Sequence, residues 1–311
     1  MKRKLLRFVP WRFVPAGWLD PLGSRMRFRL YAQGQRHKLK KGREVNNGRS
    51  WEGLEATVVV VVRNGSAAVL SALNSAEAAI LRDARSRGSA SPYVGLQVMD
   101  DASTDGTHEA VATWMKGARV PVRLYRMAWQ VGVTRARNLG LERVETERLL
   151  FLDADNTLFE DGWIRYRQAA EAHPDAAVIV GPLRVTNRMR TMSETVGAQP
   201  FDLDVLLSEG PQRDVSGLFL VDSLRRLGGF DEDLLLDLWG LEDYDLWIRL
   251  GLAEMEVVSL SDEVGTMFRG AETFWAQKTI RTLAHAQGVF ERRFGPKFTA
   301  YRTAEENEPT A

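Results

Sequence analysis

An apolar run of strand length ends in two carboxylates at Leu149-Leu150-Phe151-Leu152-Asp153-Ala154-Asp155-Asn156. A short apolar run that stops at a turn is typical of a strand buried on both faces of a parallel sheet. Open α/β sheets bind their ligands at the carboxyl ends of such strands. These eight residues therefore predict a central strand and, directly after it, the edge of a polar site.

The rest of the chain alternates between strand and helix patterns. The valine-rich run from Thr57 to Arg63 predicts another buried strand, which Asn64-Gly65 ends. The remaining predicted strands are Val94–Met99, Val120–Met127, Ala177–Val180, Gly217–Val221 and Glu256–Leu260, and the predicted helices are Ser66–Arg87, Asp105–Met115, Val133–Val144, Glu242–Leu250 and 272–294. Periodicity weakens from 187 to 214, which is typical of a loop or an active-site lid. The alternation predicts an α/β fold with a mostly parallel central sheet and helices on both faces.

The composition excludes several classes of protein. The chain has 311 residues, 44% hydrophobic and 27% charged, which is enough for a sizeable core and is not typical of a disordered protein. It has no cysteine, which excludes disulfides, thiolate zinc sites and a cysteine nucleophile. A metal would have to bind to oxygen ligands or to one of four histidines.

The formal net charge of +1 conceals two oppositely charged parts. Residues 1–50, here called the basic arm, hold 14 Lys and Arg against Asp20 and Glu44, a net charge of +12. This leaves 28 basic and 39 acidic residues, a net charge of −11, beyond position 50. Aromatic residues alternate with the arginines of the arm. That combination suits an anionic membrane surface, and it equally suits a tail that is solvated or packed on the acidic body.

No segment predicts secretion or a membrane span. Pro10 and Pro15 interrupt the apolar stretch that a signal peptide needs, and no apolar run approaches the roughly 18 residues of a spanning helix. We therefore expect a cytoplasmic protein, soluble or peripheral at the inner face of the cell membrane. Nucleic acid is not an expected partner, because no recognition motif accompanies the basic arm.

Three acidic clusters follow predicted strands or begin a predicted helix. Asp100-Asp101 follows Val94–Met99, Asp153 and Asp155 follow the strand at 149–152, and Glu242-Asp243-Tyr244-Asp245 begins a late helix. One such pair is most often a turn or a helix cap. Three in succession indicate a site.

These segments resemble the family 2 glycosyltransferases. The segments similar to the nucleotide-sugar half of that family are Val98-Met99-Asp100-Asp101-Ala102-Ser103-Thr104-Asp105-Gly106-Thr107, Gly132 with Ala136-Arg137-Asn138-Leu139-Gly140-Leu141, and Leu150–Asn156. Those similar to its acceptor half are Gly217–Leu220, Leu227-Gly228-Gly229-Phe230-Asp231-Glu232 and Gly240–Trp247. The resemblance covers residues 56–268. It implies a GT-A fold and inverting transfer of a sugar, with a UDP-sugar as the expected donor.

The resemblance also implies roles for the donor-side residues. Asp155 matches the metal ligand of the family's DXD motif, with Asp153 behind it in the donor site. Mg²⁺ or Mn²⁺ held by one or two carboxylates would neutralise the charge that develops on the departing diphosphate. Asp101 matches the carboxylate that accepts the uracil N3–H, and Asp100 is adjacent. Arg135 and Arg137 lie on the segment that passes near the diphosphate, and Arg137 is the preferred phosphate contact.

On the acceptor side, inverting transfer needs a base opposite the leaving group. Asp243 matches that base in the family's ED motif, and Glu242 is its neighbour in acceptor binding. A helix that begins at Glu242 would favour these carboxylates as anions and lower their basicity, and a charged helix start is the alternative interpretation of the cluster. Trp239 could offer a stacking face to a sugar, whereas Trp247 is expected in the core.

Two departures from the family pattern bear on the donor. The first strand ends in Arg63-Asn64 where relatives often carry a small hydroxyl residue and a tyrosine, so Arg63 is expected to stack on the base through its planar guanidinium. Many relatives also place a histidine after the last strand, where Met267-Phe268-Arg269-Gly270 stands here. Either Arg269 binds phosphate directly or the metal has fewer protein ligands.

The sequence thus predicts a basic arm at 1–50, a GT-A domain at 51–270 and a helical extension at 271–311. The predicted function is sugar transfer from a nucleotide-diphosphate sugar to a hydroxyl of a glycan or lipid-linked acceptor. Two alternatives stay open. A sugar nucleotidyltransferase would be expected to carry a longer glycine-rich loop than Asn64-Gly65-Ser66. A catalytically inactive binding module of the same fold would tolerate loss of Asp155 or Asp243, and both are present.

Overall fold

A computed structural model of the chain describes residues 42–186, 194–209, 214–232, 240–268, 290 and 294. The chain divides into two compact units, residues 1–41 and 42–311, and the described residues all belong to the second. Nearly all of the basic arm lies outside the described residues, and so does the predicted helix at 272–294 except for Phe290 and Phe294.

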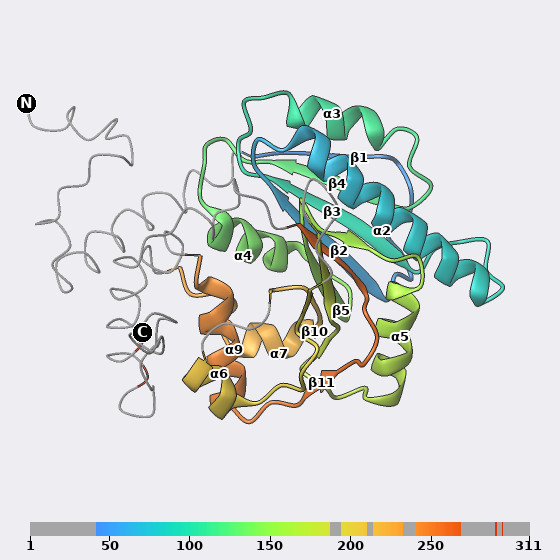
Figure 1. The fold of residues 1–311 in the computed structure, drawn as a ribbon. Coiled ribbons are helices and arrows are strands. Elements are labelled where there is room, and N and C mark those ends of the chain that lie inside the picture. Colours follow the sequence, from blue (N-terminus) through green and yellow to red (C-terminus); the bar gives the residue numbers. More distant parts are fainter. Residues whose placement is uncertain are drawn as a thin grey trace, which may run out of the picture. The chain divides into compact units, whose positions relative to one another are not determined.

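The described unit is built on an eight-stranded mixed sheet in the order β1-β4-β3-β2-β5-β10-β7-β11 (Figure 1). Its strands are β1 (Arg43–Asn46), β2 (Ala56–Val62), β3 (Val94–Asp100), β4 (Val122–Arg126), β5 (Arg148–Asp153), β7 (Val178–Val180), β10 (Gly217–Leu220) and β11 (Val257–Ser259). The pairs β4-β3, β3-β2, β2-β5 and β7-β11 are parallel, as predicted. By contrast, β10 runs antiparallel between β5 and β7.

The central strands are apolar because helices cover both of their faces. The helices are α2 (Ser66–Ser86), α3 (Thr107–Trp114), α4 (Val133–Arg143), α5 (Gly162–Ala172), α6 (Leu203–Glu209), α7 (Val221–Arg226) and α9 (Glu242–Leu252). Figure 1 shows α2, α3 and α5 on one face of the sheet and α4, α7 and α9 on the other. Val58, Val60 and Val62 of β2 belong to the core on the α2 side, and burying such side chains contributes about 1.5–3 kcal/mol each.

The helix α4 lies against the sheet at unusually short range. A Cβ added to Gly140 would come within 2.8 Å of Val59 Cγ1, so only glycine fits this contact. The Gln97 side chain of β3 donates a buried hydrogen bond of 2.9 Å to the Gly140 carbonyl oxygen. Close packing fixes α4 laterally, and with it the side chains that α4 sends toward the carboxyl ends of the strands.

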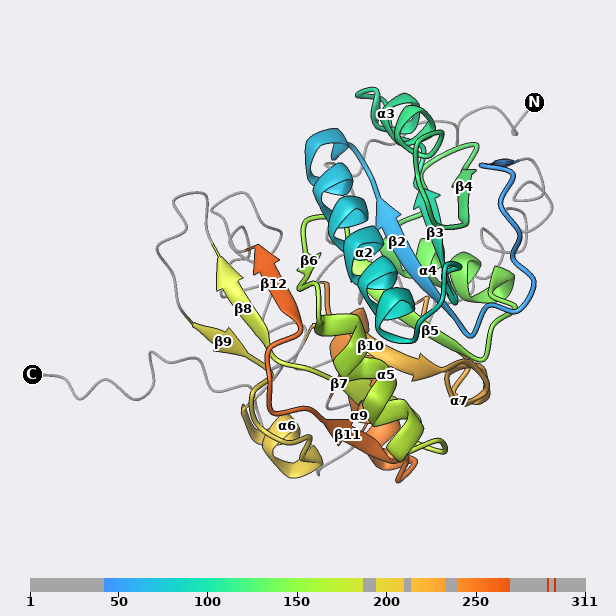
Figure 2. The ribbon, with the colours of Figure 1, turned by 90° about the vertical axis from the view of Figure 1, so that its right-hand side faces the viewer.

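A second, four-stranded sheet has the order β6-β12-β8-β9 (Figure 2). Its strands are β6 (Thr157–Leu158), β8 (Leu183–Thr186), β9 (Thr195–Val196) and β12 (Gly265–Phe268). β6 follows β5 after a three-residue turn, Ala154–Asn156, so this turn joins the two sheets. β12 pairs antiparallel with β6 and parallel with β8.

The structure corrects the predicted organisation in two places. β1 lies inside the predicted basic arm and pairs with β4 at the edge of the large sheet, so the domain begins before position 51. Its sequence, REVN, has no apolar pattern because three of its four residues are exposed. The segment 187–214 was expected to be a loop, but its described part contains β9 and α6.

Candidate active site

The candidate site lies at the carboxyl ends of β2, β3 and β5, opposite the start of α9. This is where parallel strands direct the loops that bind ligands. Of the three predicted acidic clusters, the structure brings two together, the one after β5 and the one at α9, through a single arginine.

Arg137 joins the donor side of the predicted site to its acceptor side. Its Nη2 donates to Asp153 Oδ1 and its Nη1 to Glu242 Oε1, both at 2.8 Å. The side chains of Arg137 and Glu242 are 5% and 7% exposed, whereas that of Asp153 is 35% exposed. We call these residues the Arg137 triad. Charge-assisted hydrogen bonds in such a buried setting are strong and geometrically specific.

This arrangement gives Arg137 two carboxylate partners at the place where a phosphate contact was predicted. Burial lowers the pKa of Arg137, but the charges on Asp153 and Glu242 outweigh that effect and raise it above its ordinary value. The guanidinium lies 5.4 Å from the centre of the Phe230 ring, which covers it. Arg137 is therefore placed to hold two carboxylates rather than to meet solvent or a diphosphate directly.

Arg135 is likewise directed at protein carboxylates. Its Nη1 donates to Glu232 Oε1 at 2.7 Å and to Glu142 Oε1 at 3.2 Å. One turn further along the same helix, the Asn138 side chain accepts the Phe230 N–H and donates to the Phe230 carbonyl oxygen, both at 2.9 Å. These contacts fasten the segment 229–232 to α4, which the sequence did not indicate.

Around the triad, carboxylates outnumber cations. Burial and then the charge on Asp153 raise the pKa of both Asp155 and Asp214 to about 6. Burial, followed by the charge on Glu242, also raises the pKa of Asp243 well above its ordinary value, although Arg137 opposes this. Arg137 pairs with Asp153 and Glu242, and its charge also acts on Asp214 and Asp243. A cluster with this charge favours binding of a cation or of protons.

Asp243 lies in the first turn of α9, where the helix N-terminus was expected to lower its basicity. Burial, followed by the charge on Glu242, instead raises the pKa of Asp243. Its Oδ1 accepts the Tyr244 N–H at 2.7 Å, which orients the carboxylate. In the same helix, Asp245 pairs with Arg249 at 2.7 Å, and Trp247 is fully buried in the core, as expected for Trp247.

The residues after β5 suit a divalent metal by their chemistry. Asp155 lies at the protein surface, yet the groups around it desolvate its carboxylate enough to raise its pKa, and it forms no ion pair within the described residues. Mg²⁺ and Mn²⁺ prefer carboxylate oxygens and are often held by one or two of them together with a substrate phosphate. No group of three His, Asp or Glu side chains in the described ranges is arranged to hold a metal ion. A metal here would thus depend on Asp155, with Asp153 beside it, and on ligands from the substrate.

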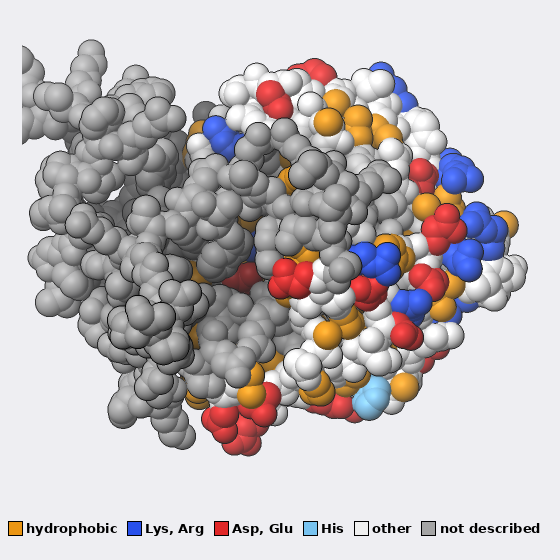
Figure 3. All heavy atoms as spheres, viewed as in Figure 1, with side chains coloured by type: hydrophobic (Ala, Val, Ile, Leu, Met, Phe, Trp, Pro, Cys, Tyr) orange, Lys and Arg blue, Asp and Glu red, His pale blue; other side chains and the backbone are white. Residues whose placement is uncertain are grey.

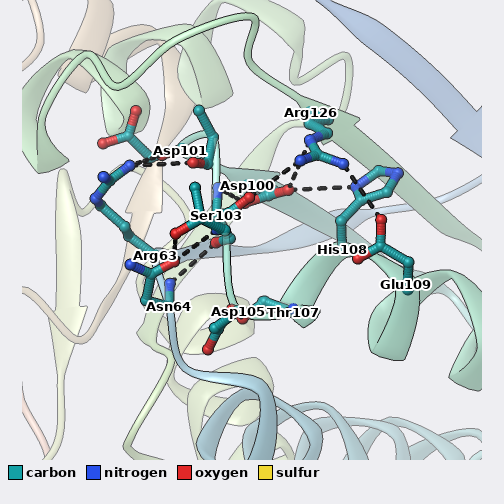
Figure 4. A network of polar contacts seen from close by, with 12 residues as sticks. Arg63, Asn64, Asp100, Asp101, Ser103, Asp105, Thr107, His108, Glu109 and Arg126 are labelled. Carbon is teal, nitrogen blue, oxygen red and sulfur yellow. Dashed lines mark hydrogen bonds and ion pairs between the residues drawn. The ribbon is translucent and has the colours of Figure 1, made fainter.

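The loops after β2 and β3 are linked by hydrogen bonds between their residues (Figure 4). Arg63 Nη1 donates to the carbonyl oxygens of Asp101 and Ala102 at 2.6 and 3.2 Å. The Asn64 N–H donates to Ser103 Oγ at 3.0 Å, and Asn64 Oδ1 accepts the Thr104 N–H at 2.8 Å. Asn64 and Ala102 both adopt the left-handed conformation, with φ of 50° and 55°. The two loops therefore form one rigid wall of the site.

Within this wall the two adjacent aspartates have different surroundings. Asp101 accepts the N–H groups of Val131 and Gly132 at 2.6 and 3.0 Å, so it fixes the loop that leads into α4. Asp100 is completely buried and accepts the Ser103 N–H at 2.9 Å. Its Oδ2 faces His108 Nδ1 at 3.3 Å and Arg126 Nε at 3.8 Å. Asp100 thus supports the wall from behind, and its place in the donor site stays a prediction.

Two predicted residues cannot be placed, and two others went unpredicted. Trp239 and Arg269 lie outside the described residues. The structure adds Asp214 and Asn156, whose side chains share a hydrogen bond of 2.7 Å. Asn156 directly follows the aspartate pair, and its position in the turn was the one signal available. Asp214 lies at the end of a segment without periodicity, so no sequence signal pointed to it.

Comparison with known proteins agrees with this geometry. The family model "Glycosyl transferase family 2" matches residues 57–201, which span β2 to β9. These residues form a glycosyltransferase family 2 domain. The match ends before α9, so Glu242 and Asp243 lie beyond it.

Individual relatives of the family 2 domain are distant. The Bos taurus polypeptide N-acetylgalactosaminyltransferase 6 is 26% identical over 268 residues, covering 75% of this chain and 41% of that protein. The chain thus spans less than half the length of this curated relative.

Solved structures similar to the family 2 domain establish its fold. S. aureus TarS (residues 1–349) in complex with UDP-GlcNAc is similar with a TM-score of 0.58 and 16% identity, over 76% of this chain and 67% of that one. The mannosyltransferase PcManGT from Pyrobaculum calidifontis, in complex with GDP-Man and Mn²⁺, gives a TM-score of 0.55 and 19% identity over 88% and 72%. The predicted GT-A fold, with its large central sheet flanked by helices, is confirmed.

Proposed function

We propose that the protein transfers a sugar, with inversion, from a nucleotide-diphosphate sugar to a hydroxyl of a glycan or lipid-linked acceptor. One observation carries this proposal: Arg137 binds Asp153 of the donor side and Glu242 of the acceptor side, beside Asp243. The arrangement holds a candidate metal loop and a candidate base at a fixed separation. A single-step displacement needs such groups on opposite sides of the reacting carbon.

Asp243 is the candidate general base. A carboxylate is a weak base at its ordinary pKa, and the raised pKa brings Asp243 closer to the range in which it can accept a proton from an acceptor hydroxyl. The hydrogen bond from the Tyr244 N–H orients the carboxylate. Glu242 is fixed by Arg137, so it maintains the site and borders the acceptor.

On the donor side, Asp155 is the candidate ligand of Mg²⁺ or Mn²⁺. When bound, the metal would supply a Lewis acid that stabilises the charge of the departing diphosphate. Asp153 is kept near Asp155 by its ion pair with Arg137. The mannosyltransferase PcManGT, whose structure is a complex with GDP-Man and Mn²⁺, has a similar fold, and this supports the proposal of a divalent metal.

The wall formed by the loops after β2 and β3 is the candidate nucleobase subsite. Arg63 is exposed and anchored through Nη1 alone in the described contacts, so its guanidinium plane can stack on a base. Asp101 is the candidate acceptor of the uracil N3–H. Its two oxygens are already oriented by the N–H groups of Val131 and Gly132. UDP-sugars are thus the first donors to test, and GDP-sugars the second.

The test is metal-dependent release of UDP or GDP from a panel of nucleotide sugars. We expect release with one donor in the presence of Mn²⁺ or Mg²⁺, little release with EDTA, and faster release when the correct acceptor is added. A sugar nucleotidyltransferase would instead form nucleotide sugar from nucleoside triphosphate and release pyrophosphate. Binding of a donor without turnover under any condition would favour the inactive module.

We also propose that the basic arm brings the enzyme to an anionic membrane surface, where lipid-linked acceptors reside. Among the described residues, no helix combines the length and apolar character needed to cross a bilayer, and the +12 charge of residues 1–50 favours anionic headgroups. Flotation with phosphatidylglycerol vesicles should retain the full chain and lose a chain that lacks residues 1–41. Equal flotation of both chains would instead favour an arm that is solvated or packed on the acidic body.

A further inference from the structure

The turn that carries Asp155 is held by a residue with no assigned role, Asn156. This side chain is 1% exposed and directly follows the candidate metal ligand. The Asn156 N–H closes the turn by donating to the Asp153 carbonyl oxygen at 3.0 Å. One residue later the chain enters β6 of the second sheet. The position of Asp155 therefore depends on how this turn is fastened between the two sheets.

The Asn156 side-chain amide donates one hydrogen bond and accepts another. Its Nδ2 donates to Asp214 Oδ2 at 2.7 Å, and its Oδ1 accepts the Phe268 N–H at 3.3 Å. Asp214 stands at the entry to β10, and its other oxygen, Oδ1, accepts the Ser216 N–H at 2.5 Å. Phe268 ends β12. The amide thus connects the turn to one strand of each sheet.

The chemistry of this pair requires one amide and one carboxylate. An aspartate at position 156 could still accept from Phe268 but would face the Asp214 carboxylate, and like charges at that distance repel. An asparagine at position 214 could still accept from Ser216 but would direct its NH₂ at the NH₂ of Asn156. Exchanging the two side chains would restore all three hydrogen bonds with unchanged net charge.

We propose that Asn156 is a positioning residue that, through Asp214 and the Phe268 amide, holds Asp155 where a metal and the donor diphosphate would meet it. The inference rests on the proposed function, because it assigns Asn156 to the metal-dependent part of donor binding. Asp214 takes part as the fixed partner of the amide and does not touch the reacting atoms.

The experiment compares the wild type with N156D, D214N and the exchanged double variant N156D/D214N. Calorimetry would measure binding of UDP and of GDP, each with Mn²⁺ and with EDTA. We expect N156D to weaken Mn²⁺-dependent nucleotide binding by about tenfold or more, as loss of a hydrogen bond to a charged group implies. D214N should weaken it less. The double variant should bind within about threefold of the wild type, because its hydrogen bonds are complete.

Nucleotide binding in EDTA distinguishes positioning from general support. We expect it to stay within about threefold of the wild type in all four proteins, since the side-chain hydrogen bonds of the changed pair go to Ser216 and Phe268 and not to the loops after β2 and β3. Equal losses with and without Mn²⁺ would overturn the proposal. So would unchanged Mn²⁺-dependent binding in N156D, or failure of the folded double variant to recover it.

Hydrogen exchange of the Phe268 amide in the ligand-free chain tests the hydrogen bond between Asn156 and Phe268 without a nucleotide-sugar donor. Exchange should accelerate in N156D, because repulsion from the Asp214 carboxylate would push the side chain at position 156 away from the Phe268 N–H, and it should return toward the wild-type rate in the double variant. If the wild type bound neither UDP nor GDP with Mn²⁺, the proposed function would fail while this exchange pattern would still support the fastening role. An unchanged exchange rate in N156D would overturn that role whatever the nucleotide data show.

Discussion

The candidate site has a nucleobase end, formed by the loops after β2 and β3, and a transfer end around Arg137. The two ends differ in how their carboxylates are compensated. At the nucleobase end, Asp100 and Asp101 are buried and accept backbone N–H groups, with His108 and Arg126 also facing Asp100. At the transfer end, Arg137 pairs with Asp153 and Glu242, and burial together with neighbouring carboxylates raises the pKa values of Asp155, Asp214 and Asp243. The first end is preorganised by the protein alone. The second carries negative charge that a bound cation would balance.

Surface charge does not explain this difference. On the face shown in Figure 3, Lys and Arg side chains are interspersed with Asp and Glu over the described right-hand part of the molecule. Mixed charges of this kind are screened by salt and contribute little each. The imbalance that matters is local to the transfer end.

The largest expected effect comes from removing the candidate base. Asp243→Asn should lower sugar transfer by about 10²–10⁴-fold, the usual contribution of a general base, and leave donor binding largely unchanged. Steady-state kinetics and calorimetry measure the two quantities separately. Asp245→Asn is the matched control for a carboxylate in the same helix whose role is structural. Normal turnover of Asp243→Asn would refute the assignment.

The next effect concerns stability. Arg137→Met should lower the free energy of unfolding by about 3–5 kcal/mol, because two partly or fully buried carboxylates lose their partner. Arg135→Met, on the same helix but at a more exposed position, should cost about 1 kcal/mol or less. Urea unfolding of both variants gives the comparison. Similar losses would show that the triad is no more important than an ordinary ion pair.

A smaller effect is a dependence of stability on pH. Because the pKa of Asp155 is raised from 3.8 to about 6, the folded chain binds more protons than the unfolded chain between these values. Without metal, stability should therefore fall as pH rises through this window. Asp155→Asn should remove the part of this loss of stability that Asp155 causes. The variant should therefore unfold at a higher temperature than the wild type at pH 7, and the difference between the two unfolding temperatures should disappear below pH 4.

Bound metal should make the wild type unfold at a higher temperature than Asp155→Asn, since a cation compensates the charge on Asp155. With Mn²⁺ and UDP present, thermal unfolding of the wild type should shift upward at pH 7, and that of Asp155→Asn should shift little. Equal shifts in the two proteins would place the metal elsewhere.

The smallest effect is expected at the preorganised end. Arg63→Ala should weaken UDP binding by about three- to tenfold through loss of stacking. It should change the free energy of unfolding by less than about 1 kcal/mol, because Arg63 is exposed. Arg63→Lys keeps the charge and loses the planar group, so it separates stacking from charge. If Lys restored binding fully, stacking would not be the cause.

The strands and helices that pack on both sides were predictable because burial leaves a pattern in the sequence. The valines of β2 and the apolar run of β5 lie within one or two residues of the predicted bounds. β1 has exposed side chains, and β6 and β9 have two residues each, so no periodicity revealed them. α5 was missed for a similar reason, since only three of its eleven residues are buried.

Local patterns of apolar and polar residues were enough to predict the α/β class. The order of the acidic clusters along the chain is likewise a local property, and it carried the resemblance to family 2 glycosyltransferases. The tertiary structure decided which charges meet. Arg137 is 16 residues from Asp153 and 105 from Glu242, and Asn156 is 58 residues from Asp214. Contacts over such separations follow from how α4, β10 and α9 pack on the sheet, and a local pattern does not contain that packing.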